Sequence, residues 1–142
     1  MTELFLIAEI GGRAVAIAAD QVESVVDIGV VTPVPRADPR VKGLAALRSR
    51  VVTVINSCVA LGLPCPGDAA RRAVITPIDG HPYAMLVEGV EDVAAYEVQP
   101  LTSGVALSAG WKSVATSVIE HRGEPALVVD LRALVPGLAA AA

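Results

Sequence analysis

The segment from Leu4 to Ala19 is LFLIAEIGGRAVAIAA, two apolar runs separated by a pair of glycines. Glycine adopts positive φ without steric cost, and two-residue hairpin turns require such angles. We therefore expect a strand over Leu4 to Ile10, a tight turn at Gly11-Gly12 and a returning strand over Arg13 to Ala19. The chain is predicted to begin with a β-hairpin.

A second hairpin follows about midway along the chain, with strands at Ala73 to Asp79 and Tyr83 to Glu88 and a turn at Gly80-His81. The pattern that ends the first hairpin, Asp20-x-Val22-Glu23-x-Val25, returns after the second as Glu88-x-Val90-Glu91-x-Val93. A shorter echo joins Val54-Ile55-Asn56 to Val128-Val129-Asp130. These echoes indicate duplication of a small β-unit. They favour two contiguous halves meeting near Pro64 to Arg72, although a terminal segment could cross over.

The other segments alternate between strands and short helical turns. Asp20 to Ile28 fits one helical turn running into a strand, and Arg40 to Leu47 is predicted to form a short helical turn. The strongest strand pattern is Val51 to Ile55, and a short helix is expected at Ser57 to Leu61. The remaining predictions are strands at Val93 to Val98, Ser113 to Glu120 and Ala126 to Val129, a turn at Arg122-Gly123, a short helix from Asp130 to Val135, and a frayed tail at 136–142.

Composition restricts the function classes. Apolar residues make up 54% of the 142 residues and charged residues 18%, and the net charge is −4. Such a sparse and acidic charge does not suit nucleic acid, which needs a phosphate-neutralising surface. The longest uncharged run, Val51 to Gly67, contains two prolines and falls short of the ~20 apolar residues of a membrane span, so no membrane insertion is expected. The start Met1-Thr2-Glu3 lacks a basic signal-peptide region, which predicts a cytoplasmic protein.

No residue pattern indicates catalysis or metal binding. Two cysteines, Cys58 and Cys65, are too few for a disulfide framework or a zinc site and are expected to be reduced. Ser103, His121 and Asp130 could supply a hydrolytic triad only if the fold brought them together, and their spacing does not predict this. We expect neither enzymatic activity nor a cofactor.

Positive charge is concentrated in one segment. Five of the eleven Lys and Arg residues lie between positions 36 and 50, and two of them, Arg48 and Arg50, flank a predicted turn. In an acidic chain this local patch suits an acidic partner surface. The alternative, charges that only keep a turn soluble, stays open on the sequence.

The segment from Val41 to Asn56, VKGLAALRSRVVTVIN, resembles the signature of the CheW family of chemotaxis coupling proteins. That signature is lysine-glycine, two residues, Asn-Leu-Arg-Gly, then an apolar strand ending Pro-Val-Ile-Asp-Leu-Arg. The segments around Val22, Val34, Leu86 and Val128 follow in the order of the family, so the resemblance runs from about Leu4 to Val135.

The resemblance implies one CheW-like domain over residues 1–142, mainly β, with two five-stranded barrels like Src-homology-3 domains sharing an apolar core. CheW-like proteins are not enzymes. They couple chemoreceptors to the histidine kinase CheA in arrays at the inner membrane, and they bind the cytoplasmic tip of the receptor and the regulatory domain of CheA. The positions that would bind receptor or kinase here are Val22, Gly43, Leu47, Arg48, Arg50, Val52 and Val54.

The chain departs from the family signature at several positions. The differences are Ser24 for Glu, Ala46 for Asn, Ser49 for Gly, Thr53 for Pro, and Asn56-Ser57-Cys58 for Asp-Leu-Arg. They favour a divergent member that serves another receptor cluster or pathway. A second hypothesis is a CheW-like barrel that no longer couples and instead binds a small apolar ligand or a different signalling partner.

Overall fold

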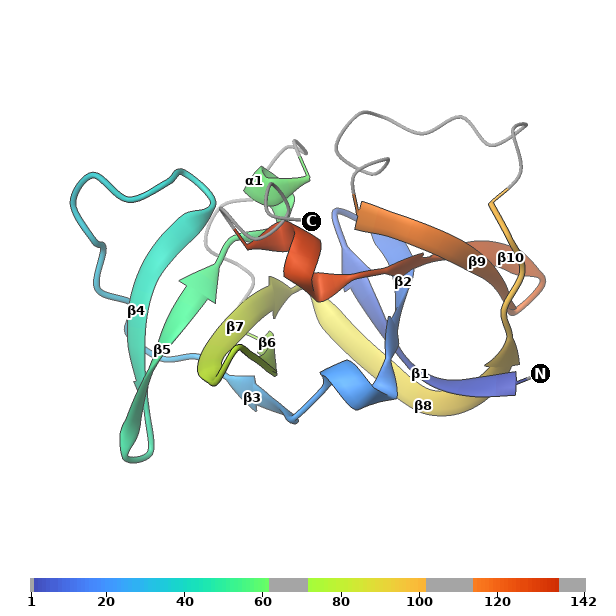
Figure 1. The fold of residues 1–142 in the computed structure, drawn as a ribbon, viewed down its shortest axis with the longest axis horizontal. Coiled ribbons are helices and arrows are strands. Elements are labelled where there is room, and N and C mark those ends of the chain that lie inside the picture. The colour runs from blue at the N-terminus through green and yellow to red at the C-terminus, as the bar shows by residue number, and fades with distance from the viewer. Residues whose placement is uncertain (1, 62–71, 102–113, 136–142) are drawn as a thin grey trace.

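The computed structural model describes residues 2–61, 72–101 and 114–135, which form two five-stranded sheets (Figure 1). The first sheet, here called barrel 1, has the strand order β8-β1-β2-β10-β9, and the second, barrel 2, has the order β3-β6-β7-β5-β4. The strands are β1 (Thr2–Ile10), β2 (Arg13–Ala18), β3 (Ser24–Asp27), β4 (Val41–Leu47), β5 (Arg50–Ile55), β6 (Arg72–Ile78), β7 (His81–Val87), β8 (Gly89–Glu97), β9 (Ala115–His121) and β10 (Glu124–Val129). The short helices of these residues are η1 (Ala19–Gln21), α1 (Ser57–Ala60) and η2 (Leu131–Leu134). The expected mainly β fold is confirmed.

The two predicted hairpins are present. Gly11 and Gly12 have φ of 62° and 77°, the left-handed values that a two-residue turn needs at both central positions. The second hairpin turns at Asp79-Gly80, one residue before the predicted Gly80-His81, with φ of 51° and 81°. Asp tolerates this conformation because its short polar side chain can bond to the local backbone.

Residues 20–28, whose pattern fits a helical turn running into a strand but decides neither, contain the end of η1 and strand β3. The predicted helix after β5 is confirmed as α1, and the turn at Arg122-Gly123 joins β9 to β10. The expected junction of the two halves, Pro64 to Arg72, lies outside the described residues except for Arg72, which begins β6. Cys65 and the tail at 136–142 also lie outside them.

The predicted helical turn at Arg40 to Leu47 is wrong, because this segment is strand β4. It pairs antiparallel with β5, with Ala45 opposite Val52 and Leu47 opposite Arg50. Ala45 is buried while Leu44 and Ala46 are exposed, the alternation of a strand with one buried face. A short apolar run does not distinguish helix from strand by itself, and here the pairing with β5 decides.

The internal echo corresponds to equivalent positions in the two barrels. Ile7 pairs with Ala16 in the first hairpin, and Ile75 pairs with Ala84, at the same spacing, in the second. Both sheets also close in the same way. Each has an isolated antiparallel bridge, Gln99 with Val118 in barrel 1 and Thr32 with Leu44 in barrel 2.

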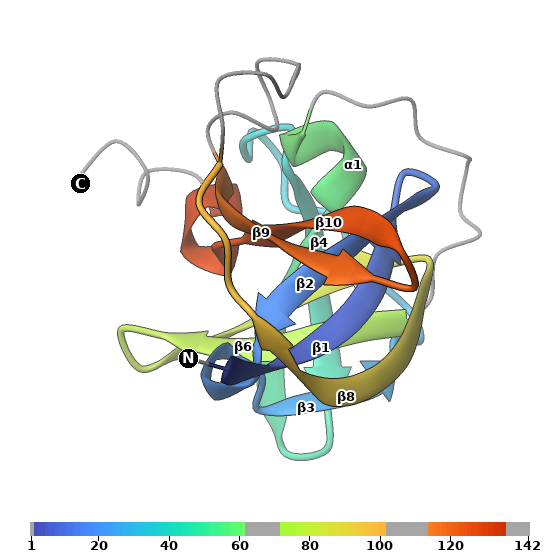
Figure 2. The same cartoon turned by 90° about the vertical axis from the view of Figure 1, so that its right-hand side faces the viewer.

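The barrels nevertheless exchange strands, so the predicted contiguous halves are wrong. The first hairpin, β1-β2, lies in one sheet with β8, β9 and β10 (Figure 2), whereas β3, β4 and β5 lie in the other sheet with the second hairpin, β6-β7. The two hairpins have the same register and the same apolar pattern. The local sequence therefore does not determine which of them β3, β4 and β5 will pair with. The short helix η1 after β2 leads the chain out of barrel 1, and β3 then pairs with β6.

Three apolar clusters explain the composition. One fills barrel 1 with Phe5, Ile7, Ala16, Ile119, Ala126 and Val128. A second fills barrel 2 with Ile28, Ala45, Val52, Val54, Ala73, Ile75, Ala84 and Leu86. The third and largest, here called the seam, joins the barrels and draws residues from both sheets, among them Leu6, Ile17, Ile55, Val74 and Met85. Alternate residues of β1 therefore enter the barrel and the seam, and an apolar residue is needed on both faces.

Two leucines on β1 test the seam. Leu6 is 5% exposed in the seam, whereas Leu4, two residues away, is 56% exposed. We expect Leu6→Ala to cost about 2–5 kcal/mol of unfolding free energy, and Leu4→Ala to change it by no more than about 0.5 kcal/mol. Urea denaturation should show one transition for both barrels in each variant. Separate unfolding of the barrels in Leu6→Ala would contradict a shared seam.

Gly43 has no side chain at the point where barrel 2 closes. Thr32 and Leu44 exchange two backbone hydrogen bonds of 2.8 and 2.9 Å beside it. A Cβ on Gly43 would lie 2.8 Å from the carbonyl carbon of Thr32, and the φ of 153° is itself unfavourable for other residues. The absence of a side chain at Gly43 therefore permits this close approach of the two backbone segments.

We expect Gly43→Ala to destabilise the protein by about 1–3 kcal/mol, because the closing bridge must move to admit a methyl group. Hydrogen exchange should accelerate at the amides of Thr32 and Leu44. Gly29→Ala is the matched control, since a Cβ there meets nothing within 4 Å. Equal stability of the two variants would show that the bridge is not tightly packed.

Candidate functional site

The β4-β5 hairpin forms an edge of barrel 2 and carries the basic turn. Val52 and Val54 face the barrel interior and are 0% exposed, while Val51 is 59% exposed and Leu44 is 38% exposed. Because side chains alternate along a strand, Leu44, Ala46 and Val51 share the outer face. Figure 1 shows this hairpin extending from the end of barrel 2 that lies away from barrel 1. The outer face is an apolar surface beside a charged turn.

Six of the seven predicted binding residues lie on this hairpin, but they do different things. Arg48 and Arg50 are exposed at the turn, and Leu47 is partly buried against the interior of barrel 2. Val52, Val54 and Gly43 are buried and support the hairpin from within. The seventh, Val22, follows η1 and packs against the seam.

The sequence prediction missed the outward-facing Leu44 and Val51. The period-2 pattern of the strand contained the signal, since buried Val52 and Val54 leave Val51 and Thr53 on the other face. Two more exposed apolar residues, Val30 and Val34, lie in the segment that the Thr32 bridge attaches to β4.

The cations of the basic segment have different electrostatic partners. Arg50 forms an ion pair with Glu23, and Arg40 binds Asp38 through two side-chain contacts of 3.0 and 3.1 Å. The side-chain hydrogen bonds of Arg40, followed by its backbone N–H, lower the pKa of Asp38 to about 2. Arg48, which has a left-handed φ of 58°, forms no ion pair among the described residues. Arg48 is therefore available to a partner.

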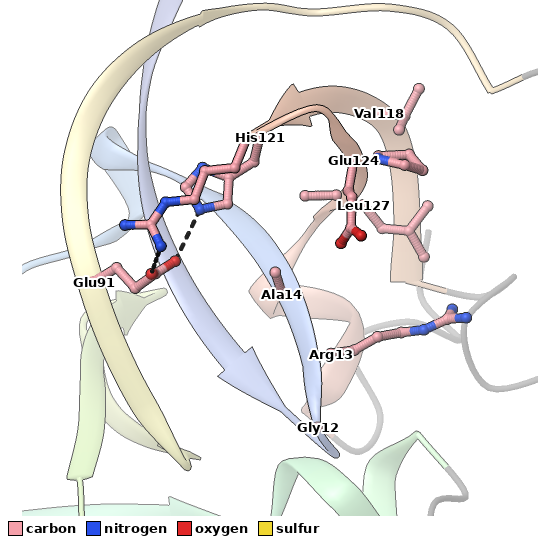
Figure 3. A pocket seen from close by; sticks show the side chains of 11 residues that line it. Gly12, Arg13, Ala14, Glu91, Val118, His121, Glu124 and Leu127 are labelled. Atoms are coloured by element: carbon pink, nitrogen blue, oxygen red, sulfur yellow. Dashed lines mark hydrogen bonds and ion pairs between the residues drawn. The ribbon is translucent and has the colours of Figure 1, made fainter.

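The equivalent end of barrel 1 contains a pocket of about 570 Å³ (Figure 3). His121 lies in its wall, with Nε2 2.9 Å from a carboxylate oxygen of Glu91 and Nδ1 2.8 Å from the hydroxyl of Tyr96. Charged side chains, among them Arg13, Arg122 and Glu124, line the pocket. Apolar residues, among them Val118, Pro125 and Leu127, line it as well.

The structure gives His121 and Asp130 separate partners. Asp130 accepts hydrogen bonds from the side chain of Gln21 and the backbone N–H of Arg132, both at 3.0 Å, while His121 binds Glu91 and Tyr96. Ser103 lies outside the described residues. Within the described ranges, no group of three or more His, Cys, Asp or Glu side chains is arranged to hold a metal ion. Nor is any helix in those ranges long and apolar enough to cross a membrane.

Comparison with known proteins agrees with this architecture. The family model for the CheW-like domain matches residues 4–138. A curated relative, the chemotaxis protein CheW of Thermotoga maritima, is 36% identical over 82 residues, which are 58% of this chain and 54% of that protein. The match thus spans about half the length of the relative. The crystal structure of the scaffolding protein TtCheW from Thermoanaerobacter tengcongensis superposes with a TM-score of 0.81 over 96% of both chains, at 17% identity, and shows the same fold. Because the family match covers nearly the whole chain, this protein belongs to the CheW-like domain family.

Proposed function

We propose that the protein is a non-enzymatic adaptor that couples chemoreceptors to the histidine kinase CheA in a signalling array. Membership of the CheW-like family supports a scaffold role in chemotaxis. The observation that carries the proposal for this chain is the β4-β5 hairpin, where exposed Val51 and Leu44 lie beside Arg48, which has no ion-pair partner within the described ranges. The proposed partners are the regulatory domain of CheA and the cytoplasmic tip of a receptor.

The hairpin combines two features of protein-binding surfaces. Exposed apolar side chains on a sheet can be covered by a partner, which releases water from both surfaces. An arginine next to them can form charge-assisted hydrogen bonds with acidic side chains and orient the complex. In this proposal Leu47, Arg48 and the outer face make contact, while Gly43, Val52 and Val54 hold the hairpin in shape. Val22 packs against the seam.

The protein would act in the cytoplasm and reach the inner membrane only through the receptors in the array. Three of its departures from the family signature, Ala46, Ser49 and Thr53, lie on the β4-β5 hairpin that carries the proposed surface. Ala46 and Thr53 belong to the two paired strands themselves. A partner of this chain would therefore meet a smaller, apolar side chain at Ala46 and additional hydroxyl groups at Ser49 and Thr53.

Arg48→Glu tests the charge of the surface. It should weaken binding to the receptor tip by about tenfold, because an acidic partner would then meet a like charge. Isothermal titration calorimetry with the receptor tip and with the CheA regulatory domain measures the effect. Arg122→Glu is the matched control, since Arg122 occupies the corresponding turn of barrel 1 with φ of 52°. Failure of the unmodified protein to bind either partner would refute the proposed function.

Val51→Ser and Val52→Ala distinguish a residue that contacts the partner from one that supports the hairpin from the interior of barrel 2. Val51→Ser should weaken partner binding several-fold and change the unfolding free energy by about 0.5 kcal/mol or less, because Val51 is exposed. Val52→Ala should instead lower the unfolding free energy by about 1–3 kcal/mol, because it leaves a cavity in barrel 2. Urea denaturation and calorimetry measure both quantities. Unchanged affinity in Val51→Ser would remove the outer face from the site.

A further inference from the structure

Glu23 connects two parts of barrel 2 that are not neighbours in the sheet. Its backbone N–H donates to the carbonyl of Ile75 at 2.7 Å, which attaches this residue to β6. Its carboxylate forms the ion pair with Arg50, the first residue of β5. In the strand order β3-β6-β7-β5-β4, two strands separate β3 from β5. The ion pair therefore ties the β4-β5 hairpin to the start of β3.

Barrel 1 contains a corresponding set of side-chain contacts. Glu91 is the residue equivalent to Glu23 in the sequence echo, and it contacts His121 at 2.9 Å and Arg122 at 3.3 Å (Figure 3). His121 and Arg122 lie at the turn of β9-β10, the counterpart of β4-β5. In each repeat, the glutamate thus contacts a residue at the turn of the last hairpin of that repeat, β4-β5 or β9-β10.

The two turns differ in which arginine is held. In barrel 1, Glu91 contacts Arg122, the arginine that has a left-handed φ. The residue in the same place in barrel 2 is Arg48, yet Glu23 pairs with Arg50. In barrel 2, therefore, Arg48, the residue of the turn that has a left-handed φ, forms no ion pair among the described residues.

We propose that Glu23 is a positioning residue, which by holding Arg50 fixes the β4-β5 turn so that Arg48 is presented to an acidic segment of a partner protein. This inference rests on the proposed function and assigns separate roles to the two arginines. Arg50 belongs to the support of the hairpin, and Arg48 makes the contact.

The Glu23–Arg50 ion pair is expected to stabilise the β4-β5 turn locally. The side chains of Arg50 and Glu23 are 45% and 39% exposed, and ion pairs this exposed add little to global stability. Loss of the tie should instead raise the rate of hydrogen exchange at β4 and β5 amides next to the turn by about two- to fivefold. The global unfolding transition should hardly move.

The test compares Glu23→Gln, the charge-exchanged double variant Glu23→Arg/Arg50→Glu, and the unmodified full chain. Hydrogen exchange and affinity for the receptor tip and the CheA regulatory domain are measured for each. We expect Glu23→Gln to loosen the turn and weaken binding by about two- to fivefold, and the double variant, which has the unmodified net charge, to restore both. Glu91→Gln should loosen only the β9-β10 turn, and Glu3→Gln controls for the loss of one negative charge.

The outcomes separate this inference from the proposed function. Unchanged exchange at the β4-β5 turn in Glu23→Gln overturns the inference, whatever the binding data show. It is also overturned if the turn loosens and affinity stays constant while Arg48→Glu still weakens binding. If the unmodified protein binds neither partner, the proposed function fails and with it the presentation of Arg48 to a partner.

Discussion

The burial of both faces of the central strands is the constraint on which the rest of the structure depends. Strands β1, β2, β6, β7 and β10 each place alternate residues in a barrel interior and in the seam. Neither barrel alone would keep the seam side chains from water, so each barrel forms part of the core of the other. The exchange of β3-β5 and β8-β10 adds covalent connections across the same seam. A mean hydropathy of +0.60, unusual for a chain with no apolar helix of spanning length in its described ranges, follows from strands buried on both sides.

This shared core determines where exposed apolar residues can remain. The β4-β5 hairpin lies at an edge of its sheet, so one face is buried by barrel 2 and the other is not. The buried face supplies rigidity, because Val52 and Val54 are enclosed, and the close packing of Gly43 against Thr32 fixes the start of the hairpin. The outer face is therefore a preformed surface, which lowers the entropy cost of binding a partner. At the turn, Glu23 forms an ion pair with Arg50, whereas Arg48 forms none with any residue that the structure describes.

Local features of the fold were predictable to different extents. The hairpins followed from glycine turns between apolar runs, and the echo located equivalent positions in both repeats. The helical turn expected at residues 40–47 failed, because a short apolar run takes its conformation from its neighbour, and its neighbour is β5. Six of the seven predicted site residues lie on one hairpin, and their function stays a prediction. The site prediction could not separate contact from support, since Val51 and Val52 differ only in the face on which they lie.

The sequence by itself determined the strands, the tight turns, the duplicated pattern and the excess of small apolar side chains, because these depend on backbone preferences and on periodicity within short segments. The tertiary structure decided which hairpin each set of three strands joins, which face of β4-β5 remains exposed, and which arginine Glu23 engages. These depend on contacts between residues far apart in the chain, such as Glu23 with Arg50 and Thr32 with Leu44. The two hairpins have the same register and present equivalent edges for pairing. Which hairpin β3-β5 and β8-β10 pair with is therefore determined by the path of the whole chain.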